Sequence, residues 1–224
     1  MKLGTWEELL KAITTCRRCP LHASRKKPVP GEGPKSTEVM LVGEAPGASE
    51  DEAGRPFVGA AGRLLTAVLE ASGVPRSSVY ITNVVKCRPP GNREPRQEEI
   101  DACSPYLETQ LKLIRPRLVV TLGNVAGRWF FTRAGIPWPG IMKARGRVRR
   151  ISVAGVEFTL LPTIHPAAAL YNPRLRRVFE EDIAKIRKVL EVVGGGAPAK
   201  TRSLLQYIEK QQSRENPENC GVGG

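Results

Sequence analysis

Four cysteines have the residue type and spacing of a metal site. Cys16 and Cys19 form a C-x2-C pair, and Cys87 and Cys103 are separated by 15 residues. Four thiolates accept either a zinc ion or a [4Fe-4S] cluster, because both take four sulfur ligands in a near-tetrahedral arrangement. The wide second spacing favours a cluster, since a zinc ribbon usually has a second short pair. Four unrelated buried cysteines are the alternative, because free cysteine is commonly buried.

Three further segments could take part in chemistry at a shared site. They are the sequence Gly-Glu-Ala-Pro-Gly at residues 43–47, Asn83 and His165. Glycines let the backbone approach a ligand closely, an Asn side chain offers a donor beside an acceptor, and a His can donate to developing negative charge. Each segment taken alone also has a structural explanation: a turn, a loop cap, or a hydrogen bond to a backbone carbonyl.

The hydrophobic pattern predicts alternating helices and strands that would position these segments. A Thr5-x-x-Glu8 capping box predicts the start of the first helix, and Pro105 is expected to interrupt a longer one. Two β-branched runs flank Ala154-Gly155 and predict a hairpin or adjacent strands. The predicted strands cover 39–42, 79–85, 118–122, 147–153 and 156–161, and the further helices cover 60–72, 96–114, 124–133 and 174–193.

This order of elements predicts an α/β fold whose strands pair mainly in parallel, with helices on both faces of the sheet. In such sheets ligands bind beyond the carboxyl ends of the strands. The segment 43–47 follows the first predicted strand, Asn83 lies near the end of the second, and His165 follows the last. We therefore expect all three to meet in one crevice.

The charge of the chain favours a polyanionic partner. Its 224 residues include 35 Lys and Arg against 22 Asp and Glu, a formal charge of +13, and residues 109–156 contain no Asp or Glu. Contacts of Lys and Arg with phosphate release counterions, which gives sequence-independent affinity for nucleic acid. A solvated basic face on a heat-adapted protein is the alternative.

The remaining composition predicts a cytosolic protein without membrane contact. No apolar stretch approaches the roughly 20 residues that cross a bilayer, and the N-terminus does not resemble a signal peptide. An odd number of cysteines, five, argues against a disulfide framework. The length predicts one domain at residues 1–193, followed at 194–224 by a glycine-rich linker and a tail in which Cys220 is free.

Considered jointly, the motifs resemble those of the family 4 uracil-DNA glycosylases, iron-sulfur proteins of archaea and thermophilic bacteria. The resemblance covers about residues 10–190. It rests on the four cysteines, on Gly-Glu-Ala-Pro-Gly at 43–47, Gly-Arg-Pro-Phe-Val-Gly-Ala-Ala-Gly at 54–62, Thr82-Asn83, His165-Pro166-Ala167 and Asn172-Pro173.

The resemblance implies a three-layer α/β/α fold with a short, mainly parallel sheet, and a structural [4Fe-4S] cluster on Cys16, Cys19, Cys87 and Cys103. It also implies that the protein hydrolyses the N-glycosidic bond of uracil in DNA, without a catalytic metal, and leaves an abasic site for base-excision repair. The alternative is a non-catalytic iron-sulfur or zinc protein that binds nucleic acid through the same basic residues.

The resemblance also implies roles in a pocket that receives a flipped base. Phe57 would stack on the uracil ring, Asn83 would pair with N3–H and O4, and His165 would donate a hydrogen bond to O2 as negative charge develops there. Gly43, at the end of the first strand, would let the backbone approach the base.

Two glutamates acquire roles by the same resemblance. Ala45 and Gly47 stand where uracil glycosylases with a Gly-Gln-Asp-Pro-Tyr motif have the Asp that positions water and the Tyr that excludes the thymine methyl group. Glu50 would take over exclusion of the methyl group. Glu44 or backbone groups would position the water.

The DNA contacts are expected to come from several loops. Arg88 lies in a basic, proline-rich loop, and Leu170 or Tyr171 would wedge into the space left by the flipped base, with Arg174 close behind. Residues 201–208 resemble a sliding-clamp peptide, with an idle or folded-back tail as the alternative. We expect a monomer.

Overall fold

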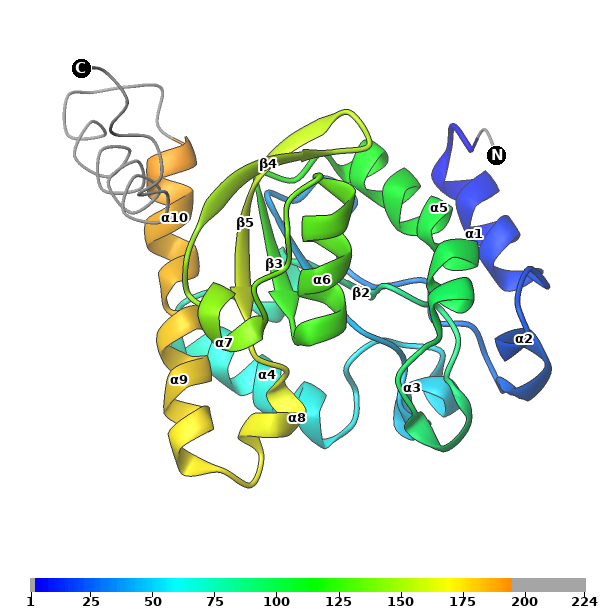
Figure 1. Ribbon diagram of the computed structural model, residues 1–224, viewed down its shortest axis with the longest axis horizontal. Coiled ribbons are helices and arrows are strands. Elements are labelled where there is room, and N and C mark those ends of the chain that lie inside the picture. The colour runs from blue at the N-terminus through cyan, green and yellow to red at the C-terminus, as the bar shows by residue number, and fades with distance from the viewer. Residues whose placement is uncertain (1–2, 195–224) are drawn as a thin grey trace, which may run out of the picture.

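The computed structural model describes residues 3–194 and has a single five-stranded sheet with helices packed on both faces (Figure 1). The strand order is β2-β1-β3-β5-β4, and every neighbouring pair is parallel except the antiparallel β4–β5 pair at one edge. The predicted three-layer α/β/α class is confirmed. The strands are β1 Val39–Gly43, β2 Tyr80–Asn83, β3 Leu118–Leu122, β4 Arg149–Val153 and β5 Val156–Thr163.

Each face of the sheet has its own hydrophobic core, because successive side chains of a strand point to opposite faces. Met40 and Val42 of β1 pack in one core with side chains of α1, α5 and α6, whereas Leu41 packs in the other with α4, α9 and α10. The helices are α1 Trp6–Thr14, α2 Leu21–Ser24, α3 Ala48–Ala53, α4 Ala60–Ala71, α5 Gln97–Ile114, α6 Asn124–Arg133, α7 Ile141–Ala144, α8 Pro166–Ala169, α9 Pro173–Ile183 and α10 Lys185–Gly194.

Local signals predicted two details correctly. Thr5 caps α1 by accepting a hydrogen bond from the backbone N–H of Glu8, and the Glu8 carboxylate accepts one from the backbone N–H of Thr5. β4 and β5 form a hairpin, and its two turn residues have positive φ, 53° at Ala154 and 78° at Gly155. That geometry matches the right-handed twist of the flanking strands.

The predicted interruption at Pro105 is wrong, because α5 continues through it. A proline in a helix removes the hydrogen bond to the carbonyl four residues earlier, here that of Asp101. Asp101 is exposed, so water can satisfy that carbonyl. The opposite side of α5 is buried along its length and holds the helix against the sheet.

The predicted single helix at 174–193 is also wrong, because α9 ends at Ile183 and α10 begins at Lys185. Asp182 lies immediately before this junction and is fully buried. Its carboxylate accepts hydrogen bonds from Arg145 and from the Thr163 hydroxyl. These contacts tie the end of α9 to β5, and the helix is interrupted at Ala184 directly after them.

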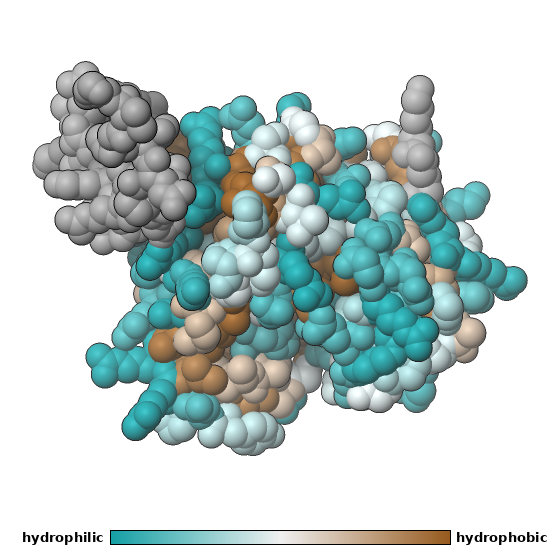
Figure 2. Space-filling model, in the orientation of Figure 1, coloured by the Kyte–Doolittle hydropathy of each residue, from teal (hydrophilic) through white to brown (hydrophobic). Residues whose placement is uncertain are grey.

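The surface seen in Figure 2 is mostly hydrophilic, with apolar residues in separate small areas. Within residues 3–194, no helix is long and apolar enough to cross a membrane. The predicted boundary near residue 193 stays a prediction. Cys220 and the clamp-like segment 201–208 lie outside the described residues.

Candidate active site

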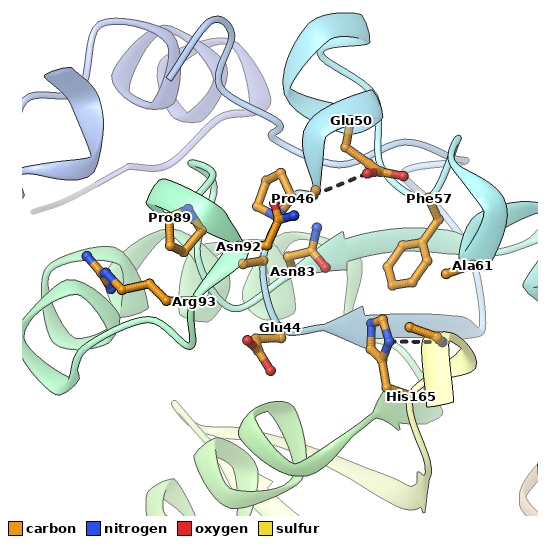
Figure 3. Close-up of a pocket in the computed structure, with 13 residues that line it drawn as sticks. Glu44, Pro46, Glu50, Phe57, Ala61, Asn83, Pro89, Asn92, Arg93 and His165 are labelled. Atoms are coloured by element: carbon orange, nitrogen blue, oxygen red, sulfur yellow. Dashed lines mark hydrogen bonds between the residues drawn. The ribbon is translucent and has the colours of Figure 1, made fainter. Parts of the chain in front are cut away.

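The three segments expected to meet at the carboxyl ends of the strands do line one pocket, of about 320 Å³ (Figure 3). Parallel pairing places Gly43 of β1 beside Asn83 of β2, so the loop after β1 begins next to the Asn83 side chain. His165 arrives from β5, two residues after the strand ends. The lining residues are Glu44, Ala45, Pro46, Gly47, Glu50, Phe57, Ala61, Asn83, Pro89, Asn92, Arg93, His165 and Ala167.

Asn83 has an unused hydrogen-bonding atom at this pocket. Its side chain is 1% exposed, and its Oδ1 has no hydrogen-bond partner among the described residues. A buried polar atom without a partner costs about 1–3 kcal/mol. An acceptor kept at that cost beside a cavity is suited to a ligand that donates a hydrogen bond.

Gly43 is required by close packing rather than by an unusual backbone angle. A Cβ at this position would lie 2.5 Å from Asn83 Oδ1 and 2.6 Å from Phe57 Cζ. The absence of a side chain therefore allows the amide and the aromatic ring to converge on the same part of the pocket.

Phe57 is held in a conformation that few non-glycine residues adopt. Its φ is 52°, its side chain is 6% exposed, and its ring centroid lies 5.8 Å from that of His165. Gly62 makes the turn possible, since a Cβ there would lie 1.9 Å from the Phe57 carbonyl oxygen. Such strain persists only when the surrounding structure holds it.

Glu50 supplies part of that support. Its Oε1 accepts hydrogen bonds from the backbone N–H groups of Val58 (2.9 Å) and Gly59 (2.8 Å), and its Oε2 accepts one from Gly47 (3.2 Å). One carboxylate thus connects the loop after β1 to the turn that carries Phe57. The sequence motif located Glu50 in the pocket, but this contact was missed because its partners are backbone groups.

His165 is poised to donate from Nε2. The backbone N–H of Ala167 donates to His165 Nδ1 at 3.2 Å, so the neutral ring carries its proton on Nε2. Burial lowers the pKa of His165 to about 4, against the opposing effect of the nearby Glu50 charge. The imidazole is therefore neutral at physiological pH.

Glu44 lines the pocket opposite Phe57 (Figure 3). Its pKa is raised above the ordinary value, first by burial and then by the charge of Glu94, while Arg128 acts in the opposite direction. A carboxylate with a raised pKa is a better proton acceptor than an exposed one. Asn92 and Arg93, from the loop before α5, complete this side of the pocket.

The predicted DNA contacts lie outside the pocket lining. Arg88 Nε donates to Asn92 Oδ1 at 2.7 Å, so it braces the loop that borders the pocket. Leu170 is partly buried against the core, whereas Tyr171 is 90% exposed. Arg174 is exposed at the start of α9.

Part of the charge of the basic run at 109–156 is neutralised by carboxylates from other segments. The ion pairs include Arg117–Glu38, Arg128–Glu94, Arg133–Glu108, Arg145–Asp182 and Arg150–Glu157. The run therefore does not by itself mark a DNA-binding surface.

The four predicted cysteine ligands line a second, small cavity beside α5. Donors face two of the sulfurs, since Arg25 donates to Cys87 Sγ at 3.0 Å and the Lys86 backbone N–H to Cys103 Sγ at 3.3 Å. Such donors suit sulfurs that carry negative charge as ligands. No three metal-binding side chains within residues 3–194 are placed to share a single ion. The four sulfurs nevertheless share the lining of one cavity, and thiolates are ligands for both zinc and iron-sulfur groups.

Comparison with known proteins agrees with the site. The family described as the uracil DNA glycosylase superfamily matches residues 30–191. A type-4 uracil-DNA glycosylase of Sulfurisphaera tokodaii is 49% identical over 84% of this chain and 86% of its own length. Those of Pyrobaculum aerophilum and Thermotoga maritima are 49% and 43% identical, over 80% and 85% of this chain and 91% and 99% of their own lengths.

The fold and the pocket thus define an α/β protein with a pocket beyond the carboxyl ends of parallel strands. The chain belongs to the uracil-DNA glycosylase superfamily, and within it to the type-4 family.

Proposed function

We infer that this protein is a uracil-DNA glycosylase, which takes uracil out of the DNA stack and hydrolyses its N-glycosidic bond. Family membership supports the reaction. The observation that carries the inference is the buried Asn83 Oδ1, which has no hydrogen-bond partner within residues 3–194 and lies beside a pocket that also contains Phe57 and His165. DNA is accordingly the macromolecular partner.

The pocket suits the edge of uracil. Asn83 Oδ1 would accept the N3–H of the base, and the side-chain amide would donate to O4. Cytosine presents an acceptor at N3 and a donor at C4, so the same amide orientation would leave two mismatched groups. The Phe57 ring would stack on the face of the base.

The remaining residues suit bond cleavage. Breaking the glycosidic bond leaves positive charge on the sugar and negative charge on the uracil ring, and Nε2–H of His165 would stabilise the charge that develops at O2. A neutral donor serves this purpose because it does not depend on prior protonation of the ring. Glu44 would orient the attacking water and accept its proton.

The pH dependence tests the role of Glu44. A carboxylate must be ionised to accept a proton, and the Glu44 pKa lies above its ordinary value of 4.5. The single-turnover rate should therefore fall as the pH is lowered toward that raised pKa, while His165 stays neutral down to about pH 4. In Glu44→Gln the rate should be lower and this acid limb should disappear. If the rate of Glu44→Gln still falls at low pH as in wild type, the titrating group is not Glu44.

Exclusion of thymine tests the role of Glu50. Glu50→Ala should lower the uracil rate, because the Phe57 turn loses its support, and should raise the ratio of thymine to uracil cleavage by opening space for the methyl group. Glu50→Gln keeps the bulk and should keep thymine excluded. Excision from U·G and T·G oligonucleotides measures both rates. Equal thymine ratios in wild type and Glu50→Ala would contradict the methyl-blocking role.

The four cysteines, Cys16, Cys19, Cys87 and Cys103, would hold a [4Fe-4S] cluster. Their shared cavity and the donors aimed at two sulfurs support a common metal group on these residues. The wide spacing of Cys87 and Cys103 favours a cluster over a single zinc ion. When bound, the cluster would crosslink the segment between α1 and α2, the loop after β2 and α5. It has no assigned part in the bond cleavage.

Loss of one ligand tests the cluster. Purified protein should be brown, and Cys103→Ala should lose the broad visible absorbance and melt at lower temperature, because metal binding is coupled to folding. Cys220→Ala, which changes the cysteine with no assigned ligand role, should match wild type in both. Iron and zinc analysis decides the metal, and colourless protein with one zinc per chain would remove the cluster assignment.

The reaction itself is tested with a uracil-containing oligonucleotide in EDTA, followed by alkali to cleave abasic sites. Strand breaks only at uracil are expected. Binding without breaks would instead favour the non-catalytic nucleic-acid-binding protein. Monomeric state, the roles of Arg88, Leu170 and Arg174, and clamp binding through residues 201–208 stay predictions.

A further inference from the structure

Lys86 is a fully buried lysine between the base pocket and the cysteine cavity. Its side chain is 1% exposed, and it follows the last residue of β2, Asn83, by three positions. It also lines the cysteine cavity and directly precedes Cys87. Burying an ammonium group is costly unless every donor is satisfied, so a lysine here calls for an explanation.

The Lys86 ammonium donates three short hydrogen bonds. Its Nζ lies 2.6 Å from the backbone carbonyl oxygen of Asn83, 2.7 Å from Thr82 Oγ1 and 2.7 Å from Gln110 Oε1. All three N–H groups are thereby used, and none of these acceptors is a carboxylate. The group therefore fixes the end of β2 rather than forming an ion pair.

These acceptors are themselves tied to the rest of the fold. The Gln110 amide donates to the Pro30 carbonyl at 2.7 Å and to the Tyr80 hydroxyl at 3.0 Å, and the Thr82 hydroxyl donates to the same Pro30 carbonyl at 2.8 Å. The network joins β2 to α5, the helix that carries Cys103. A satisfied buried network of this kind specifies one arrangement of its members.

The backbone of Lys86 contacts the cysteine site. Its N–H donates to Cys103 Sγ at 3.3 Å, while its side chain donates to the Asn83 carbonyl. A single residue thus contacts a predicted cluster ligand and the residue expected to read the base.

We propose that Lys86 is a positioning residue that couples the cysteine site to uracil recognition, by holding Asn83 at the end of β2 in the orientation that accepts the base. The inference rests on the proposed role of Asn83. It requires that loss of the Lys86 ammonium impair uracil recognition through Asn83 and not through general loosening of the fold.

The test measures binding rather than turnover and uses the holoprotein. One oligonucleotide contains 2′-fluoro-2′-deoxyuridine, which resists cleavage, and a second contains thymidine at the same position. Fluorescence anisotropy gives the dissociation constant for each oligonucleotide. The preference is the ratio of the constant for the thymidine oligonucleotide to that for the uracil analogue. Lys86→Met keeps the length of the side chain and removes all three donors. We expect its preference to fall about tenfold, the effect of roughly 1.4 kcal/mol, with visible absorbance retained.

Coupling to Asn83 is measured by a double-mutant cycle. Asn83→Ala should lose the preference, and Lys86→Met should add little in that background, because residues that act together are not additive. Ser104→Ala is the matched control. Trp129 Nε1 donates a buried hydrogen bond to Ser104 Oγ of α5 at 2.7 Å, and the substitution removes it. It should lower the melting temperature and leave the preference intact.

The outcomes separate the possible failures. A wild-type preference in Lys86→Met would overturn the proposal, even if the melting temperature fell, and so would full additivity with Asn83→Ala. A wild-type preference in Asn83→Ala would overturn the role of Asn83 and this inference with it. If Lys86→Met does not fold, Thr82→Val takes its place. This nearly isosteric substitution removes one acceptor of the Lys86 ammonium and should also reduce the preference. An unchanged preference in Thr82→Val would equally overturn the proposal.

Discussion

His165→Ala should lower the single-turnover rate of uracil release by about 100- to 1,000-fold, the usual effect of removing one donor to a developing oxyanion. The structure gives the reason, because His165 Nδ1 is occupied by the Ala167 N–H and leaves the proton on Nε2 at the pocket. Uracil release from a labelled oligonucleotide under excess enzyme measures the rate. Affinity for DNA should change far less.

His165→Asn separates the donor role from a capping role. An Asn side chain can still accept from the Ala167 N–H, as other helix caps do, but it is too short to place a donor where Nε2 lies. The melting temperature should therefore stay near that of wild type while the rate remains low. If His165→Asn, or His165→Ala, cleaves at the wild-type rate, stabilisation of the leaving group is not the function of this residue.

Asn83→Asp should lower the rate on uracil by about 100-fold or more, because a buried carboxylate facing O4 cannot donate and leaves mismatched groups unpaired. The ratio of cytosine to uracil cleavage should rise, since the protonated acid can pair with the edge of cytosine. Rates on U·G and C·G oligonucleotides across a range of pH measure this ratio.

Asn92→Asp is the matched control for that substitution. Asn92 lines the same pocket, and its Oδ1 accepts from Arg88, a contact that an aspartate would keep. It introduces the same charge into the same cavity without changing the proposed base-reading amide. A similar loss of uracil cleavage in both variants would mean that charge in the pocket, and not the Asn83 amide, decides the rate.

The sequence by itself determined the five strands, most of the longer helices and the location of the site. The apolar runs of β1 and β3 are buried on both faces of the sheet, as strands of a parallel sheet are, and a capping box is satisfied within one turn of α1. Parallel strands bring their carboxyl ends to one edge, so the order of elements was enough to bring Asn83 and His165 together. These features depend on local interactions and on topology.

Element boundaries that depend on packing could not be read from local signals. Pro105 predicted an interruption, yet the buried side of α5 holds the helix together. The junction after Ile183 follows Asp182, whose partners Arg145 and Thr163 lie on distant segments.

Only the tertiary structure decided the state of each functional group. The proton position on His165 and the three backbone donors to Glu50 are set by atoms that become neighbours on folding. So is the burial of Asn83 Oδ1, which has no partner in the described part of the chain. The same holds for Lys86, a lysine two residues before Arg88 that the fold buries among neutral acceptors. Burial and hydrogen bonding depend on contacts between residues far apart in the chain, and a pattern of residue types does not contain them.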